Sequence, residues 1–173
     1  MKKLLSILAT IALIETSTTS LIACNRPQEY TKEELAKLKE ENKINTTDKT
    51  IKNNLEWIAP QEKPFNTGDN KWYCVVWKSK NWNITKFKND ILVDRLHTNR
   101  ELDAKNEDED YKLNLEWYQQ NDIINTLFIR SKSVVSPWIS NRYRFKSVYR
   151  WNLTDNVPDL IIDDKGKVKV NGE

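Results

Sequence analysis

Short strand-like patterns, separated by polar turns, occupy the chain from residue 71 to its end. Residues 72–77 are apolar on both alternating faces, which is typical of a central strand that is covered on both sides. Residues 82–87 follow a polar turn and predict the returning strand of a hairpin. Residues 111–117 alternate between apolar and polar positions and predict a half-buried strand, which residues 123–130 return.

The remaining segments after residue 71 are shorter. Residues 91–96 are interpreted as a third strand, although their apolar triplet leaves strand and helix open. Residues 131–141, which contain Pro137 and Trp138, predict a loop, and residues 160–162 and 167–170 predict a terminal hairpin. No long helical pattern separates the strands, so we expect them to pair antiparallel. The sequence therefore predicts a mainly β fold, with a single small antiparallel β-sandwich or barrel-like domain.

A short helical or flexible stalk is expected before this domain. Thr31 and Glu34 form a capping box, and residues 31–42 predict a solvated helix with a narrow apolar stripe. A second helical turn is predicted within residues 48–57. We accordingly divide the chain into residues 1–23 as a signal peptide, 24–70 as a tether with a short helix, and 71–173 as the β-rich domain.

The N-terminus has the parts of a secretory signal. Lys2 and Lys3 precede an apolar segment at residues 4–14, and Ala23 supplies a small residue before Cys24. An uncleaved membrane span is disfavoured, because spanning takes about 20 apolar residues and Glu15 interrupts the segment. The stretch Leu-Ile-Ala-Cys at residues 21–24 resembles the lipobox of bacterial lipoproteins. The resemblance implies that Cys24 carries a diacylglyceryl group after cleavage and anchors the protein to the extracellular face of the cell membrane.

Composition adds a second resemblance. Lysine, asparagine and isoleucine are abundant, as expected of an A+T-rich genome, yet the chain has 7 tryptophans. Reading UGA as tryptophan, as wall-less mollicutes do, resolves that conflict. Together with the N-terminus, the chain resembles Spiroplasma surface lipoproteins, and the similar stretches are residues 71–78, 82–88 and 147–152.

Charge and thiol content narrow the classes of partner. The 28 basic and 25 acidic side chains nearly balance, so no nucleic-acid partner is expected.

Cys74 is the second of 2 cysteines and is expected to be buried without a disulfide, and His97 is expected in a loop. The acidic stretch at residues 103–110 lacks the glycine and the spacing of a calcium loop. No metal and no cofactor are expected.

A basic and aromatic segment near the C-terminus gives the candidate binding face. Four cationic side chains alternate with aromatic ones, so we expect the aromatic side to face the core and the cationic side to face solvent. A plain solvated face or a guard on an edge strand is the alternative interpretation. The candidate binding residues are Arg142, Arg144, Lys146 and Arg150, with Trp138 from the preceding loop, and the aromatic residues are Tyr143, Phe145, Tyr149 and Trp151.

The function expected from the sequence is that of a membrane-anchored surface lipoprotein that presents its β-domain for binding or adhesion. The expected partners are the membrane, through the diacylglyceryl anchor, and a host surface protein, a glycan or an anionic lipid. A single-domain lipoprotein that captures a small ligand is the alternative, and a lipid-anchored hydrolase is another. None of the common nucleotide-binding, zinc-protease or serine-hydrolase motifs is present, so no catalytic residue is assigned and no enzyme is expected.

Overall fold

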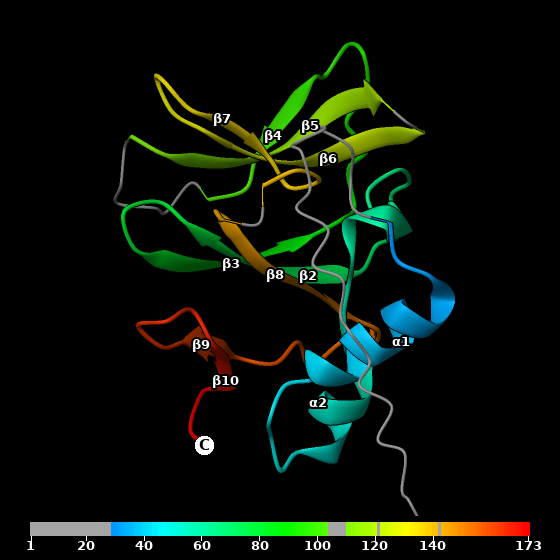
Figure 1. The fold of residues 1–173 in the computed structure, drawn as a ribbon, viewed down its shortest axis with the longest axis vertical. Helices are drawn as coiled ribbons and strands as arrows, with labels where there is room; N and C mark the ends of the chain where they lie inside the picture. The colour runs from blue at the N-terminus through cyan, green and yellow to red at the C-terminus, as the bar shows by residue number, and fades with distance from the viewer. Residues whose placement is uncertain (1–28, 104–109, 121, 142) are drawn as a thin grey trace, which may run out of the picture.

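The computed structural model describes residues 29–103, 110–120, 122–141 and 143–173. In these residues, two four-stranded antiparallel sheets lie face to face, and helices and a C-terminal hairpin form a third layer (Figure 1). The mainly β, antiparallel fold predicted from the sequence is confirmed.

The middle layer is the sheet with strand order β1-β8-β2-β3. Its strands are β1 (Leu55–Trp57), β8 (Phe145–Trp151), β2 (Trp72–Lys78) and β3 (Trp82–Lys88). All five interior residues of β2 are buried, because the strand has neighbours on both edges and a layer on each face. The prediction of a covered central strand followed by a returning strand is therefore confirmed.

The upper layer in Figure 1 is the sheet β4-β5-β6-β7. Its strands are β4 (Asn99–Glu101), β5 (Lys112–Gln120), β6 (Ile123–Arg130) and β7 (Val135–Pro137). The β5–β6 hairpin was predicted, but β7 lies inside the segment that we expected to be a loop. The half-buried pattern expected of β5 is wrong in part, because Asn114 and Glu116 are buried as well as Leu113 and Leu115.

The third strand predicted at residues 91–96 is wrong. The structure describes this whole segment and gives it no strand; Ile91 and Leu92 are exposed and Val93 alone is buried. The Asp94 carboxylate accepts hydrogen bonds from the backbone N–H groups of Leu96 and His97, at 2.8 and 2.7 Å. Such a local side-chain turn competes with strand pairing, which explains the loop.

The main core fills the space between the two sheets. It includes Phe65, Tyr73, Trp77, Leu115 and Leu127, all close to fully buried. Trp138 also belongs to this core, since its ring centroid lies 5.8 Å from that of Phe65 and only 7% of the residue is exposed. Trp138, which we predicted as a candidate binding residue, is therefore largely buried in the core, and it also lines the cleft described below.

A second cluster lies on the other face of the middle sheet. It packs Cys74, Tyr149 and Trp151 against residues from α2 (Lys49–Asn54), β9 (Leu160–Ile162) and β10 (Val168–Val170). The predicted terminal hairpin is confirmed, with β9 and β10 paired antiparallel. Burial raises the pKa of the Cys74 thiol to about 12, so the thiol stays protonated, as a buried small hydrophobe should.

The tether predicted for residues 24–70 is wrong from residue 44 onward. Ile44 and Ile51 are buried in the second cluster, β1 pairs with β8, and Phe65 lies in the main core after the 3-10 helix η1 (Pro60–Glu62). The apolar stripes in this segment are short, so the sequence alone did not indicate that the segment packs on a sheet. The folded unit therefore begins well before residue 71, and among the described residues both clusters and all strands fall within residues 44–170.

The helix α1 (Lys32–Glu41) matches its prediction. The Thr31 hydroxyl accepts from the N–H of Glu34 at 3.2 Å, and the Glu34 carboxylate accepts from the N–H of Thr31 at 2.8 Å. None of the ten described residues of α1 is buried. No helix in the described ranges is long and apolar enough to cross a membrane.

One buried hydroxyl in β6 gives a stability prediction. Thr126 is 1% exposed, and within the described structure its hydroxyl oxygen has no hydrogen-bond partner. A buried polar group without a partner costs roughly 1 to 3 kcal/mol. We therefore expect Thr126→Val, which keeps the shape, to increase the free energy of unfolding by about 1 kcal/mol in a urea titration.

The matched control is Thr85→Val in β3. The Thr85 hydroxyl accepts a hydrogen bond from Nε1 of the fully buried Trp77 at 2.9 Å. Removing it should destabilise the protein by about 1 kcal/mol, so the two substitutions should have opposite signs. A destabilising Thr126→Val would mean that ordered water satisfies the hydroxyl.

Candidate binding cleft

The residues predicted from sequence do not form one site. Cys24 and Arg142 lie outside the described residues. Trp138 is in the core. The three remaining cations, Arg144, Lys146 and Arg150, differ in their surroundings and are considered in turn.

A β-bulge in β8 separates the residues that were expected to share a face. Val76 pairs with Ser147 and Trp77 pairs with Phe145, so Lys146 is the extra residue. Phe145 then lies in the main core with Val148, whereas Tyr149 and Trp151 lie in the second cluster. The expectation of one aromatic and one cationic face is therefore wrong, because β8 is an interior strand covered on both sides.

The side chains of Arg144 and Arg150 form contacts within the protein. The Arg144 guanidinium lies 4.6 Å from the centroid of the Tyr111 ring and donates to the carbonyl oxygens of Lys78 and Ser79, at 3.2 and 3.4 Å. Arg150 donates to the carboxylate of Glu56 at 2.8 Å. Neither side chain presents its charge to solvent in the way the sequence suggested.

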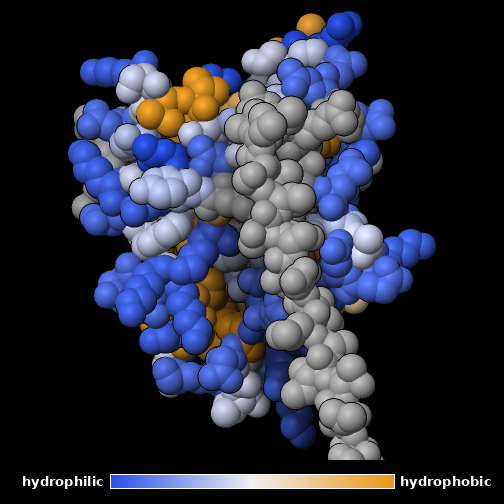
Figure 2. All heavy atoms as spheres, viewed as in Figure 1, coloured by the Kyte–Doolittle hydropathy of each residue, from blue (hydrophilic) through white to orange (hydrophobic). Residues whose placement is uncertain are grey.

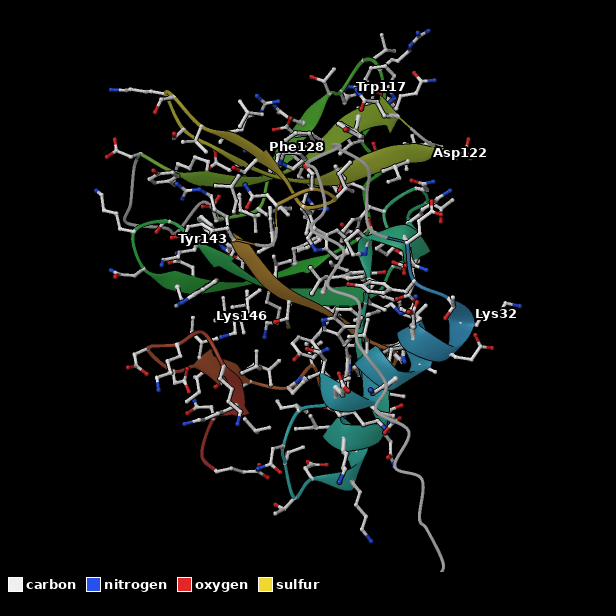
Figure 3. All side chains as sticks on the ribbon, viewed as in Figure 1. Lys32, Trp117, Asp122, Phe128, Tyr143 and Lys146 are labelled. Atoms are coloured by element: carbon white, nitrogen blue, oxygen red, sulfur yellow. The ribbon has the colours of Figure 1, made fainter. Side chains whose placement is uncertain are left out.

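Lys146 is exposed and lines a cleft of about 510 Å³. Figure 3 shows Lys146 between the middle sheet and the β9–β10 hairpin. Tyr30, Leu38 and Asn42 form one wall at α1, and Trp57 and Ser147 belong to β1 and β8. We call this feature the cleft.

The inner end of the cleft is apolar and its outer rim is aromatic and cationic. The half-buried side chains of Leu38, Trp57 and Pro60 supply the accessible apolar surface, and five nearly buried residues complete this lining: Ile58, Trp138, Ile139, Phe145 and Val148. The rim consists of Lys78, Trp82, Tyr143 and Lys146. Tyr143 is 81% exposed, so the rim is open to solvent.

The way α1 is attached explains why this part of the sheet is uncovered. The helix is joined to the sheet by the ammonium group of Lys39, which pairs with Glu56 and, at 2.6 Å, with Glu62. The Tyr149 hydroxyl adds a hydrogen bond to the carbonyl oxygen of Asn42 at 3.0 Å. These contacts are polar, so α1 lies beside the sheet without burying Leu38.

On the face drawn in Figure 2, hydrophobic side chains in orange are visible among hydrophilic ones in blue below the middle of the molecule.

The C-terminal hairpin contacts Trp82 and Lys146, which belong to the rim of the cleft. Gly166 adopts φ of +72°, and a Cβ there would lie 2.7 Å from the Trp82 indole. The Gly166 N–H donates to the carbonyl oxygen of Asp163 at 2.8 Å, and the Lys146 ammonium donates to the carbonyl oxygen of Lys165. Glycine is therefore needed both for the turn and for the close approach to Trp82.

Two ammonium groups flank one indole at the rim. Lys78 Nζ lies 5.5 Å and Lys146 Nζ 5.3 Å from the centroid of Trp82, within the range of a cation–π interaction. Lys78 Nζ also lies 5.9 Å from the centroid of Tyr143. No aspartate or glutamate is among the described residues that line the cleft. The described lining therefore carries two positive charges and no negative one, and the Asp163 carboxylate outside the lining partly offsets the charge of Lys146.

The lining groups are suited to binding. They offer indole and phenol rings, aliphatic side chains, two ammonium groups, a hydroxyl at Ser147 and an amide at Asn42. Across the described parts of the chain, no group of three or more His, Cys, Asp or Glu side chains could hold a metal ion. His97 is exposed in its loop, as predicted, and lies 3.4 Å from the carboxylate of Asp94.

Sequence reasoning identified Lys146 and Trp138 but missed Leu38, Trp57, Lys78 and Trp82. The available signal was the polar turn predicted before residue 82, and the structure pairs Lys78 with Trp82 across it. The contribution of α1 could not be inferred, because it depends on the ion pairs of Lys39 with Glu56 and Glu62, far along the chain.

The fold and the cleft define a small, mainly β protein with an open cleft whose rim is aromatic and cationic. The chain matches no known family, no curated protein and no solved structure.

Proposed function

We propose that this chain is a lipid-anchored surface protein whose β-domain binds a small ligand in the cleft. The observation that carries the proposal is the cleft itself. Small-molecule sites are concave and mainly apolar, with volumes of about 300–1,000 Å³ and a few polar groups that orient the ligand. The cleft, with a volume of about 510 Å³, an apolar inner end and a polar rim, has these properties.

This proposal favours the ligand-capture alternative over adhesion. The cationic face on which an adhesive role rested is divided, since Arg144 and Arg150 bind groups of the protein itself. The cleft instead encloses a volume suited to one small molecule. The anchor at Cys24 would keep this site at the cell surface, where it could retain a ligand near the membrane.

The anchor is tested by Cys24→Ser. Without the thiol there is no acceptor for a diacylglyceryl group, and two acyl chains are what stable anchoring generally requires. We expect the full-length protein to enter the detergent phase in a phase-partition assay and the variant to move to the aqueous phase. Equal partitioning of the two proteins would contradict lipidation.

The cleft is tested with the fragment 25–173, which contains both clusters and all described strands, and with the neutral fluorescent probe N-phenylnaphthylamine. Leu38→Trp should fill the cleft from α1 and weaken probe binding at least about tenfold. Leu35→Trp is the matched control, because Leu35 lies on the same helix but does not line the cleft. Absence of probe binding, or equal affinity in both variants, would contradict the proposed site.

A further inference from the structure

We propose that the ligand of the cleft is a free organic anion: a molecule with an apolar or aromatic body that carries a carboxylate, phosphate or sulfonate group. This inference rests on the proposed function and adds the chemical class of the ligand. It follows from the separation of charge and apolar surface along the cleft.

The cationic end consists of Lys78 and Lys146. Both ammonium groups lie beside Trp82, and Lys78 also faces the ring of Tyr143. Lys146 additionally donates to the carbonyl oxygen of Lys165. Among the ion pairs that the described residues form, none involves Lys78.

Lys78 forms no ion pair among the described residues, whereas several other lysines do. Lys39, Lys43, Lys80 and Lys112 all lie within 4 Å of a carboxylate. Lys78 is half-buried, its ammonium group lies near the rings of Trp82 and Tyr143, and it has no such neighbour among the described lining residues. An anion at this position would gain charge-assisted hydrogen bonds without having to displace a carboxylate of the protein.

The apolar end selects the body of the ligand. The apolar surface that a ligand can reach comes from the half-buried side chains of Leu38, Trp57 and Pro60, and the nearly fully buried Ile58, Phe145 and Val148 complete the apolar lining. A fully hydrated anion, such as inorganic phosphate, would leave this surface unfilled. A metal cation is disfavoured by the two ammonium groups and by the lack of carboxylates in the described lining. An organic anion satisfies both ends of the cleft at once.

The test compares two probes with the same aromatic body. Anilinonaphthalene sulfonate carries a sulfonate group, and N-phenylnaphthylamine lacks it. With the fragment 25–173, we expect the sulfonate to bind about tenfold more tightly, and we expect its affinity alone to fall as salt is added. Both probes should lose affinity in Leu38→Trp.

Lys78→Met isolates the charge, since methionine keeps an apolar stem of similar length. It should weaken binding of the sulfonate probe about tenfold and leave binding of the neutral probe unchanged. Lys80→Met is the matched control, because Lys80 is in the same turn and outside the cleft. Circular dichroism melts of each variant exclude a loosened fold, which would bind the sulfonate probe nonspecifically.

The outcomes separate the two proposals. Cleft-dependent binding of both probes with equal affinity, unaffected by Lys78→Met, would overturn the anion class and leave the proposed function standing. Loss of cleft-dependent binding for both probes would overturn the proposed function itself.

A second arm distinguishes a free anion from a membrane surface. Monomeric octyl phosphate should displace the sulfonate probe, whereas vesicles of phosphatidylglycerol should not. Displacement by the vesicles alone would overturn the proposal and assign the rim to lipid headgroups.

Discussion

Replacing Phe145 with alanine should lower the free energy of unfolding by about 3 to 5 kcal/mol, the range for deleting a buried aromatic side chain. Phe145 is 3% exposed and packs in the core between the two sheets with Trp77 and Val148. The bulge at Lys146 places it there, so alanine would leave a cavity in the middle of the molecule. Urea titration followed by tryptophan fluorescence measures the change.

The matched control is Tyr143→Ala, two residues earlier in the chain. Tyr143 is 81% exposed, so its loss should change the free energy of unfolding by less than about 0.5 kcal/mol. The loss of unfolding free energy in Arg144→Ala should fall between those of the other two variants, because the Arg144 side chain contacts the Tyr111 ring and two carbonyl oxygens. A loss below about 1 kcal/mol for Phe145→Ala would contradict the placement of Phe145 in the core.

Elements that are encoded by local pattern could be predicted from the sequence. The capping residues Thr31 and Glu34 located α1, and two-residue periodicity located β2, β3, β5 and β6. The polar turn between β9 and β10 located the terminal hairpin. In each case the signal lies within about ten residues, which is the range over which hydrophobic period and turn chemistry act.

The errors concern features that depend on distant partners. The bulge in β8 arises from its pairing with β2, and no property of residues 142–151 alone reveals it. β1 is three residues long, and it is a strand because β8 supplies its partner. Trp138 follows a short strand in a polar segment, so its burial against Phe65 could not be inferred from its neighbours.

The cleft could not be predicted from the sequence either, because it also depends on residues that are distant in the chain. Its lining comes from α1, β1, the two ends of the β2–β3 turn, residues 138–139 and the segment from Tyr143 to Val148, which the fold brings together. Only the pairing of Lys78 with Trp82 across a tight turn had a local signal. The space beside α1 exists because polar contacts, rather than apolar packing, attach the helix to the sheet.

Those polar contacts give the last prediction. Glu56 in β1 accepts from Lys39 of α1, from Arg150 of β8 at 2.8 Å, and from Asn152 at 3.3 Å. Glu56→Gln should lower the free energy of unfolding by about 1 to 2 kcal/mol near neutral pH, between the values for exposed and for fully buried ion pairs. Glu41→Gln is the control, because its pair with Lys37 is exposed and should contribute less than about 0.5 kcal/mol.

The pH dependence identifies the ion pair as the cause. Partial burial opposes ionisation of Glu56, but hydrogen bonds from Lys39, Arg150 and Asn152 outweigh it, and the pKa of the carboxyl is lowered from its ordinary value of 4.5. A carboxyl whose folded-state pKa is lowered stabilises the fold above its unfolded pKa and loses that effect as pH falls through the folded value. The stability difference between the native protein and Glu56→Gln should therefore be constant above pH 4.5 and shrink below it. A difference that does not change with pH would mean that Glu56 stabilises α1 by packing, and the cleft wall would then not depend on charge.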